Sequence, residues 1–88
     1  MAKRSLLLMP KAVEHLGWFI QHELKLVKKI YEVLDNCCDT PFTGVGQPEA
    51  LKGNFSGYWS RRVNLEHRIV YKVVGDSIVV FQLKGHYE

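Results

Sequence analysis

Basic side chains gather in one stretch of the C-terminal half of this sequence. Three of its four arginines, Arg61, Arg62 and Arg68, lie within eight residues, and Lys52 precedes them. Aromatic residues interleave with this stretch, namely Phe55, Tyr58, Trp59 and Tyr71. Guanidinium groups bind phosphate oxygens in pairs and aromatic rings stack on unpaired bases, so the stretch is typical of an RNA-binding site. The alternative is that these are solvated strand residues of a basic protein, with Trp59 in its core.

Two further residues could move protons near this stretch. Glu49 lies in a loop rich in glycine and proline, where a carboxylate could act as a general base. His86 follows the last expected strand and precedes Tyr87, and histidine suits a general acid near neutral pH. Taken singly, the ordinary interpretation is stronger for both: an exposed loop glutamate and an incidental histidine. A metal site from Glu66, His67 and His86 is conceivable, but these residues show no recognisable ligand spacing.

The alternation of side chains along a strand divides the arginines between two faces. Arg61 and Arg62 are neighbours in an expected strand and therefore point to opposite faces, so at most one of them joins a given site. The other is expected to be structural or to bind a partner. In the next strand Arg68 points away from Ile69 and Tyr71. If those two face the helices, Arg68 faces the open side of the sheet.

The N-terminal half is expected to be largely helical. Residues 5–9 predict a short buried edge strand, and Pro10 can open a helix at its first turn. One apolar face of that helix is predicted from Val13, Leu16 and Ile20. A break at residues 21–23 suggests a helical hairpin, whose second helix ends at residues 35–36. The i, i+3, i+4, i+7 pattern of this second helix is formed by Val27, Ile30, Tyr31 and Leu34.

The remainder of the chain predicts a long loop followed by strands. The loop covers residues 39–57, and loops of this length in a small domain tend to be functional. Three strands follow, at residues 58–64, 67–74 and 78–84, and Gly75-Asp76 predicts a tight hairpin turn between the last two. The expected fold class is α+β: an antiparallel β-sheet with an N-terminal helical hairpin packed on one face.

Composition limits the class of protein. The chain has 88 residues, of which 47% are hydrophobic, and a formal net charge of +3. These values predict one small domain, residues 1–88, and permit a polyanionic partner. Cys37 and Cys38 are adjacent and are the only cysteines, which argues against a disulfide framework or a four-ligand zinc site and fits the reducing cytoplasm. The apolar run Leu6–Met9 is too short for a signal peptide or a membrane span.

Several motifs together resemble one protein family. They read G-x-P-E-x-L-K at 46–52, S-G-x-W-S-R-R at 56–62, E-H-R-x-V-Y at 66–71, and a final H-Y at 86–87. This pattern closely resembles the YoeB/Txe family, which are toxins of the RelE superfamily from bacterial type II toxin–antitoxin systems. Residues 26–30 of the second helix are similar to the family as well.

The resemblance implies an activity and roles for individual residues. It implies a ribosome-dependent mRNA endoribonuclease that cuts mRNA in the ribosomal A site, inhibits translation and needs no metal or cofactor. Glu49 would take the proton from the attacking ribose 2′-OH. Arg68 would stabilise the charge on the pentacovalent phosphate, and His86 would protonate the leaving 5′-oxygen.

The resemblance also implies substrate contacts and partners. Lys52 would bind phosphate, Arg62 would assist, and Tyr87 would stack on or position a base. The partners would be mRNA on the ribosome with contacts to 16S rRNA and a small acidic antitoxin; a homodimer is compatible with the sequence, and no membrane partner is expected. The sequence departs from the family at Gly85, where a bulkier residue is common, and at Glu88, which follows the H-Y pair. The alternatives are a non-catalytic module of the same fold that binds antitoxin or RNA, and a free ribonuclease.

Overall fold

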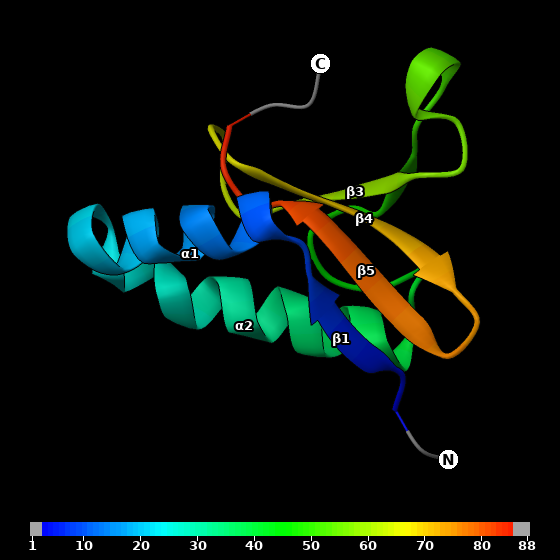
Figure 1. The fold of residues 1–88 in the computed structure, drawn as a ribbon, viewed down its shortest axis with the longest axis horizontal. Helices are drawn as coiled ribbons and strands as arrows, with labels where there is room; N and C mark the ends of the chain where they lie inside the picture. The colour runs from blue at the N-terminus through cyan, green and yellow to red at the C-terminus, as the bar shows by residue number, and fades with distance from the viewer. Residues whose placement is uncertain (1–2, 86–88) are drawn as a thin grey trace.

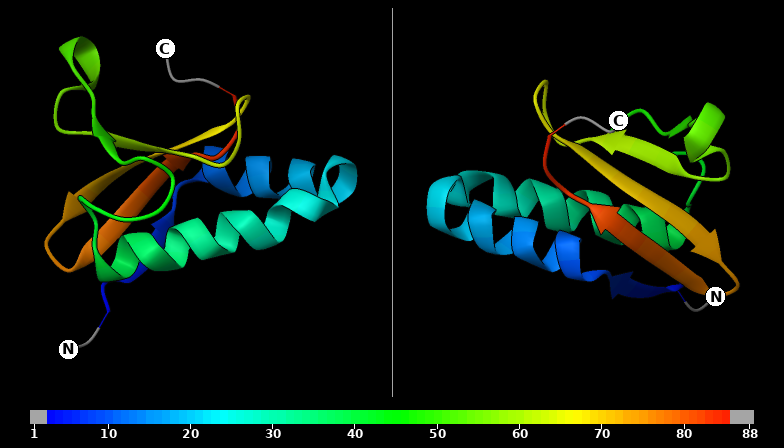
Figure 2. Two further views of the ribbon diagram at one scale, coloured as in Figure 1. Left: turned by 180° about the vertical axis from the view of Figure 1, so that it is seen from behind. Right: turned by 45° about the horizontal axis from the view of Figure 1, so that its top comes forward.

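The chain folds into two layers, a five-stranded β-sheet and a pair of α-helices that covers one face of the sheet (Figures 1 and 2). This computed structural model describes residues 3–85. Along the chain the elements are β1 (Ser5–Leu8), α1 (Pro10–His22), α2 (Leu24–Asp39), β2 (Glu49–Ala50), the 3-10 turn η1 (Gly53–Phe55), β3 (Trp59–Arg62), β4 (Arg68–Val74) and β5 (Ser77–Gln82). Across the sheet the strand order is β1-β5-β4-β3-β2. The predicted α+β class, with a helical hairpin on one face, is confirmed.

One edge of the sheet differs from the wholly antiparallel arrangement that we predicted. β1 runs parallel to β5, with Ser5 opposite Ser77 and Leu8 opposite Val80, whereas the other strand pairs are antiparallel. The prediction was wrong because side-chain alternation reports the face that a residue occupies and carries no information on strand direction. The direction of β1 depends on the path of the whole intervening chain.

The same edge is more exposed than predicted. β1 is an edge strand, as expected, but Leu7 is 52% exposed and only Leu8 packs against the core. An edge strand pairs with the sheet along one side only. The expectation of a buried strand was therefore wrong for most of β1. Among the described residues, neither helix is both long and apolar enough to cross a membrane.

The helical hairpin breaks where the sequence predicted, and each helix turns a slightly different face to the sheet. Pro10 is the first residue of α1, and Glu23, whose backbone is non-helical at φ −142° and ψ 53°, separates α1 from α2. In α1 the buried residues are Ala12 and Phe19. Two residues of the predicted apolar face are about half exposed, namely Val13 at 53% and Ile20 at 50%.

α2 differs from the prediction in one residue of its buried face and in the position of its C-terminal end. Ile30 and Leu34 are buried as predicted, but Tyr31 is exposed. The helix continues to Asp39, past the predicted end, because Cys37 and Cys38 in its last turn are buried in the core. Both helices carry more apolar residues than one stripe needs, so their sequences alone do not select which stripe meets the sheet.

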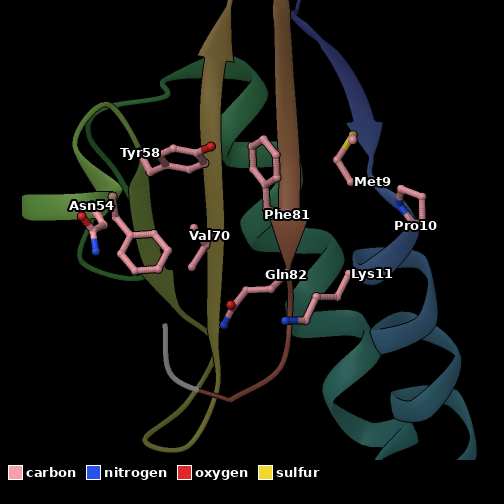
Figure 3. Close-up of a pocket in the computed structure, with 9 residues that line it drawn as sticks. Met9, Pro10, Lys11, Asn54, Tyr58, Val70, Phe81 and Gln82 are labelled. Carbon is pink, nitrogen blue, oxygen red and sulfur yellow. The ribbon is translucent and has the colours of Figure 1, made fainter. Parts of the chain in front are cut away.

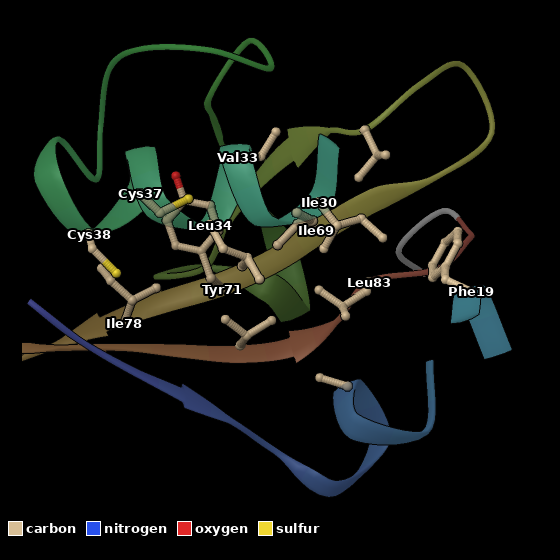
Figure 4. Packing of buried hydrophobic residues seen from close by; sticks show 13 residues of the cluster. Phe19, Ile30, Val33, Leu34, Cys37, Cys38, Ile69, Tyr71, Ile78 and Leu83 are labelled. Carbon is tan, nitrogen blue, oxygen red and sulfur yellow. The ribbon is translucent and has the colours of Figure 1, made fainter. Parts of the chain in front are cut away.

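The core lies between the helices and one face of β4 and β5. Ile30, Leu34 and Cys37 of α2 pack with Ile69 and Tyr71 of β4 (Figure 4). Further buried members include Val33, Cys38, Val63, Ile78, Val80 and Leu83. Because Ile69 and Tyr71 face the helices, Arg68 and Val70 face the other side of the sheet, as the alternation predicted. The open face of the sheet is therefore available to build a site.

Candidate active site

Strand pairing places two arginines side by side on the open face. Arg62 of β3 lies directly opposite Arg68 of β4, and residues directly opposite in an antiparallel pair point to the same face. Glu49 of β2 is paired with Ser60 of β3. Ser60 lies two residues from Arg62 and shares its face. Short β2 therefore carries the carboxylate to the same face as the two guanidinium groups.

These three side chains line one cavity. It has a volume of about 180 Å³ and is lined by Gln47, Pro48, Glu49, Arg62 and Arg68; we call it the Glu49 cavity. A carboxylate can accept a proton, and two guanidinium groups can bind phosphate oxygens bidentately. The cavity therefore combines a candidate base with positive charge for a phosphate. Ser60, beside it in β3, is buried, and its hydroxyl has no hydrogen-bond partner within residues 3–85.

Arg61 points into the protein, as the alternation predicted for one of the two neighbouring arginines. Its side chain is fully buried and its N–H groups donate to five acceptors. Nε donates to the Tyr71 hydroxyl at 3.0 Å, and the two terminal nitrogens donate to Asn36 Oδ1 at 2.6 Å, to the carbonyls of Val45 and Thr43 at 3.1 and 3.0 Å, and to the Thr40 carbonyl. Every donor of the guanidinium is thus satisfied by neutral oxygens.

This buried arginine holds the loop that leads to Glu49. Tyr71 extends the network by donating its hydroxyl to the Pro41 carbonyl at 2.6 Å. Farther along the loop, Arg62 N–H donates to the Gly46 carbonyl at 2.7 Å. Gly46 has φ +83°, and a Cβ there would lie 2.8 Å from the Arg62 carbonyl oxygen. A glycine is therefore required where the loop passes over β3.

Gln47 is a cavity residue to which the sequence analysis assigned no role. Its φ is +52°, and it is the only non-glycine residue with positive φ among residues 3–85. Residues held in the left-handed region are uncommon and cluster at functional sites. Its position between Gly46 and Pro48, two residues before Glu49, is the signal that could have identified it.

The other basic and aromatic residues of the predicted RNA-binding stretch do not all lie at the Glu49 cavity. Lys52 is exposed at the start of η1 and does not line the Glu49 cavity. Tyr71 is buried in the core, which excludes it from an RNA surface. Trp59 packs against the core and against Phe42, with ring centroids 4.9 Å apart. For Tyr71 and Trp59, the predicted interleaving of aromatic and basic residues at one surface is therefore wrong.

His86 and Tyr87 lie outside the described residues, but the residue before them is held in place. The Gly85 N–H donates to Nδ1 of His67 at 2.9 Å, and the Arg68 N–H donates to the Gly85 carbonyl at 2.9 Å. The His67 ring is 7% exposed and packs edge-on against Phe19, at 4.9 Å between centroids. Gly85 is thereby tied to the backbone of the arginine that lines the Glu49 cavity.

A second histidine holds the same segment. His15 of α1 accepts the Leu83 N–H at Nδ1, at 3.1 Å. Burial, together with nearby Lys11 and Lys84, lowers the pKa of His15, which favours the neutral ring that can accept this bond. His15 and His67 therefore both hold the backbone of residues 83–85 in place. Residues 3–85 contain no group of three side chains placed to hold a metal ion.

The family described as YoeB-like toxin of bacterial type II toxin-antitoxin system matches residues 8–87 of this chain. The chain belongs to this family. The toxin YoeB of Synechocystis sp. is 44% identical over 71 residues, which are 81% of this chain and 83% of that protein. The motif-based resemblance is thus confirmed, and the chain is a toxin of a type II toxin–antitoxin system.

Solved structures of two relatives are similar to this toxin over almost the whole chain. The YoeB/ParE toxin from Agrobacterium tumefaciens has a TM-score of 0.90 at 38% identity, covering 94% of this chain and 99% of that one. YoeB of Staphylococcus aureus is 41% identical and was solved in a heterotetrameric complex with YefM and as a dimer. The TM-score is 0.86 for the complex and 0.88 for the dimer, and each match covers 98% of this toxin and 100% of the Staphylococcus aureus chain.

Proposed function

We propose that this toxin is a metal-independent endoribonuclease that cuts mRNA in the ribosomal A site and so stops translation. The observation that carries the proposal is the Glu49 cavity, where one carboxylate meets the guanidinium groups of Arg62 and Arg68. An RNA strand supplies its own nucleophile, the ribose 2′-OH. The protein then needs a base, an acid and positive charge, and these side chains supply the base and the charge.

The proposed reaction is an internal transesterification. Glu49 takes the proton of the 2′-OH, and the 2′-oxygen bonds to the adjacent phosphorus. Arg68, with Arg62 beside it, stabilises the negative charge that develops on the phosphate oxygens. The bond from phosphorus to the 5′-oxygen breaks, and His86 donates the proton that this oxygen requires. The products are a 2′,3′-cyclic phosphate and a 5′-hydroxyl.

Lys52 and Tyr87 are proposed to act outside the bond-breaking step. Lys52 lies three residues from Glu49 but outside the cavity, so it would bind a phosphate farther along the strand. Tyr87 would stack on a base next to the cleaved phosphate. Contacts between this basic chain and 16S rRNA would hold the toxin in the A site. The toxin would therefore act in the cytoplasm. The ribosome would present the mRNA, so an 88-residue chain needs no separate module for RNA capture.

The proposed protein partner is a small acidic antitoxin. The Staphylococcus aureus relative forms a heterotetramer with YefM, and the same kind of complex is proposed for this toxin. An acidic segment laid over the Glu49 cavity would neutralise Arg62 and Arg68 and exclude RNA. A homodimer is proposed from the dimeric form of the same relative.

The experiment measures cleavage of a defined mRNA on programmed ribosomes and, separately, without ribosomes. The variants are Glu49→Gln, Arg68→Ala and His86→Gln, with Glu32→Gln on the exposed side of α2 as the matched control. We expect the three site variants to lose about 10²-fold or more in rate. The control should match wild type, and mass spectrometry should find a cyclic phosphate on the upstream product.

Three results would contradict parts of the proposal. Cleavage by Glu49→Gln and Arg68→Ala at the wild-type rate would show that the site is elsewhere. Antitoxin binding by a wild-type protein that cuts no mRNA on ribosomes would show a non-catalytic module. Equal cleavage with and without ribosomes would show a free ribonuclease.

A further inference from the structure

A second hollow opens on the same face of the sheet as the Glu49 cavity. It has a volume of about 360 Å³ and lies between the start of α1, η1 and the open face of β4 and β5 (Figure 3). Its lining includes Lys11, Asn54, Tyr58, Val70, Phe81 and Gln82; we call it the aromatic hollow. The proposed reaction assigns no role to any of these six residues.

An irregularity in the sheet supplies the hollow with two side chains from β5. Val70 of β4 is opposite Gln82, whereas the next residue, Tyr71, is opposite Val80, so Phe81 is an extra residue in β5. Val80 and Leu83 are buried in the core, and Phe81 and Gln82 both line the hollow. Regular alternation would send one of those two into the core. β-Bulges commonly re-aim side chains next to functional sites, and this one aims two at the hollow.

The chemistry of the hollow combines ring surfaces with amide and basic groups. Tyr58 and Phe81 form an aromatic wall, with ring centroids 4.9 Å apart. Asn54 and Gln82 add amides, and Lys11 adds an ammonium group. The ammonium of Lys72 lies 5.4 Å from the Tyr58 ring centroid. None of the described residues that line the hollow is acidic.

The hollow lies near the Glu49 cavity along β4. Val70 of the hollow and Arg68 of the cavity lie two residues apart on β4 and face the same side of the sheet. Two residues along a strand span about 7 Å. An RNA strand whose scissile phosphate lies against Arg68 therefore brings a neighbouring nucleotide over the hollow.

We propose that the aromatic hollow is a nucleobase subsite, which holds a base beside the cleaved phosphate and sets the base preference of cleavage. This inference rests on the proposed ribonuclease function. A base offers a flat ring for the Tyr58–Phe81 wall and polar edges for the amides of Asn54 and Gln82. The Gln82 amide already donates from Nε2 to the Lys84 carbonyl at 3.2 Å, and a base edge can add a partner for its oxygen. An aliphatic side chain from a protein partner would offer no polar group to either amide. The basic rim also suits the phosphates of an RNA strand.

The first test measures base preference on programmed ribosomes with mRNAs that differ only beside the cleaved phosphate. Phe81→Leu keeps an apolar side chain but removes the ring, and Asn54→Ala removes one amide. Val79→Ala is the control, because Val79 lies on β5 and the open face but outside the hollow. We expect both hollow variants to reduce the ratio of kcat/KM between the best and worst base about tenfold. The control should keep the wild-type ratio.

A uniform loss of rate with an unchanged ratio would overturn the proposal, because a structural defect slows all substrates alike. So would hollow variants that keep the base preference but lose affinity for the antitoxin or for a second copy of the chain. Either of those two losses would assign the hollow to a protein partner.

The second test needs no cleavage and so separates this inference from the proposed function. The Glu49→Gln protein is titrated with each of the four nucleoside 5′-monophosphates, and binding is followed by NMR. We expect shifts at Tyr58, Phe81 and Gln82 that differ between bases and weaken in the Glu49→Gln, Phe81→Leu double variant. Shifts confined to Arg62 and Arg68 would overturn the subsite. Base-dependent shifts in the hollow, combined with a wild-type protein that cuts no mRNA, would support base binding there and refute the ribonuclease, and with it the role of the hollow in the base preference of cleavage.

Discussion

The ring of His67 accepts the backbone N–H of Gly85, with 2.9 Å between Nδ1 and the amide nitrogen. The carbonyl of the same glycine accepts the N–H of Arg68 at 2.9 Å. Gly85 is thus bonded on both sides to the start of β4, and its φ of +76° suits a residue without a side chain. The proposed acid, His86, is the next residue in the chain, so we infer that His67 is a positioning residue.

Replacing His67 tests that role. We expect His67→Ala to lower kcat about tenfold or more with a smaller change in KM, because the bond that holds Gly85 is lost while the Glu49 cavity keeps its side chains. His67→Asn retains an acceptor near the position of Nδ1 and should recover much of the rate. Steady-state cleavage on programmed ribosomes gives both constants. Equal kcat in His67→Ala, His67→Asn and wild type would contradict the role.

Arg61 is expected to be essential for stability. Arg61→Lys keeps the charge but supplies fewer donors in a different geometry, so buried carbonyl groups of the loop lose their partners. We expect a loss of about 3 kcal/mol in the free energy of unfolding. Urea denaturation measures it. Arg62→Lys, at the exposed neighbouring position, is the control and should change stability by less than about 0.5 kcal/mol. Similar losses for the two variants would show that burial of Arg61 is not decisive.

Gly46 tests how closely the loop must pass β3. Gly46→Ala would place a Cβ 2.8 Å from the Arg62 carbonyl, in a backbone conformation with φ +83°. We expect a loss of about 2 kcal/mol in stability and reduced cleavage, because the clash lies between the loop and β3 where both line the Glu49 cavity. Gly17→Ala is the control. A Cβ at Gly17 would meet no neighbouring atom within 4 Å, and the residue lies inside α1, so alanine there should stabilise by about 0.5 kcal/mol or more.

Alkaline pH is expected to destabilise the fold through Cys37. Burial raises the pKa of the Cys37 thiol from 9.0 to about 11, and burial likewise raises the pKa of Tyr71 to about 12. Above pH 9 the unfolded chain releases the thiol proton while the folded chain retains it, so stability falls as the pH rises toward 11. We expect a loss of about 1 kcal/mol between pH 8 and pH 10.

Urea denaturation of wild type, Cys37→Ala and Cys38→Ala at both pH values checks this expectation. Cys37→Ala should lose most of the pH dependence, and Cys38→Ala, which leaves the Cys37 thiol in place, should keep most of it. A wild-type protein equally stable at pH 8 and pH 10 would contradict the burial of that thiol.

Local patterns in the sequence were enough to predict the main elements and the division of the arginines. The break before α2 and the strands β3, β4 and β5 were confirmed, because turn residues and periodicity act over a few neighbours. Strand alternation correctly placed Arg61 and Arg62 on opposite faces, because adjacent side chains in a strand must point to opposite sides. The structure shows that Arg61 is the one that points inward. The motifs around Glu49, Arg62 and Arg68 correctly identified the family to which the chain belongs.

The sequence by itself therefore determined the main helices and strands, the opposite faces of Arg61 and Arg62, and the family. Tertiary structure decided the rest, because those features depend on packing between distant segments. It buried Phe19 of α1 and left Ile20 half exposed, set β1 parallel to β5, and left Lys52 outside the Glu49 cavity. It also placed the extra residue Phe81 where β5 meets β4, which no periodicity within β5 reveals. Strand register and helix orientation depend on packing contacts between segments that are far apart in the sequence.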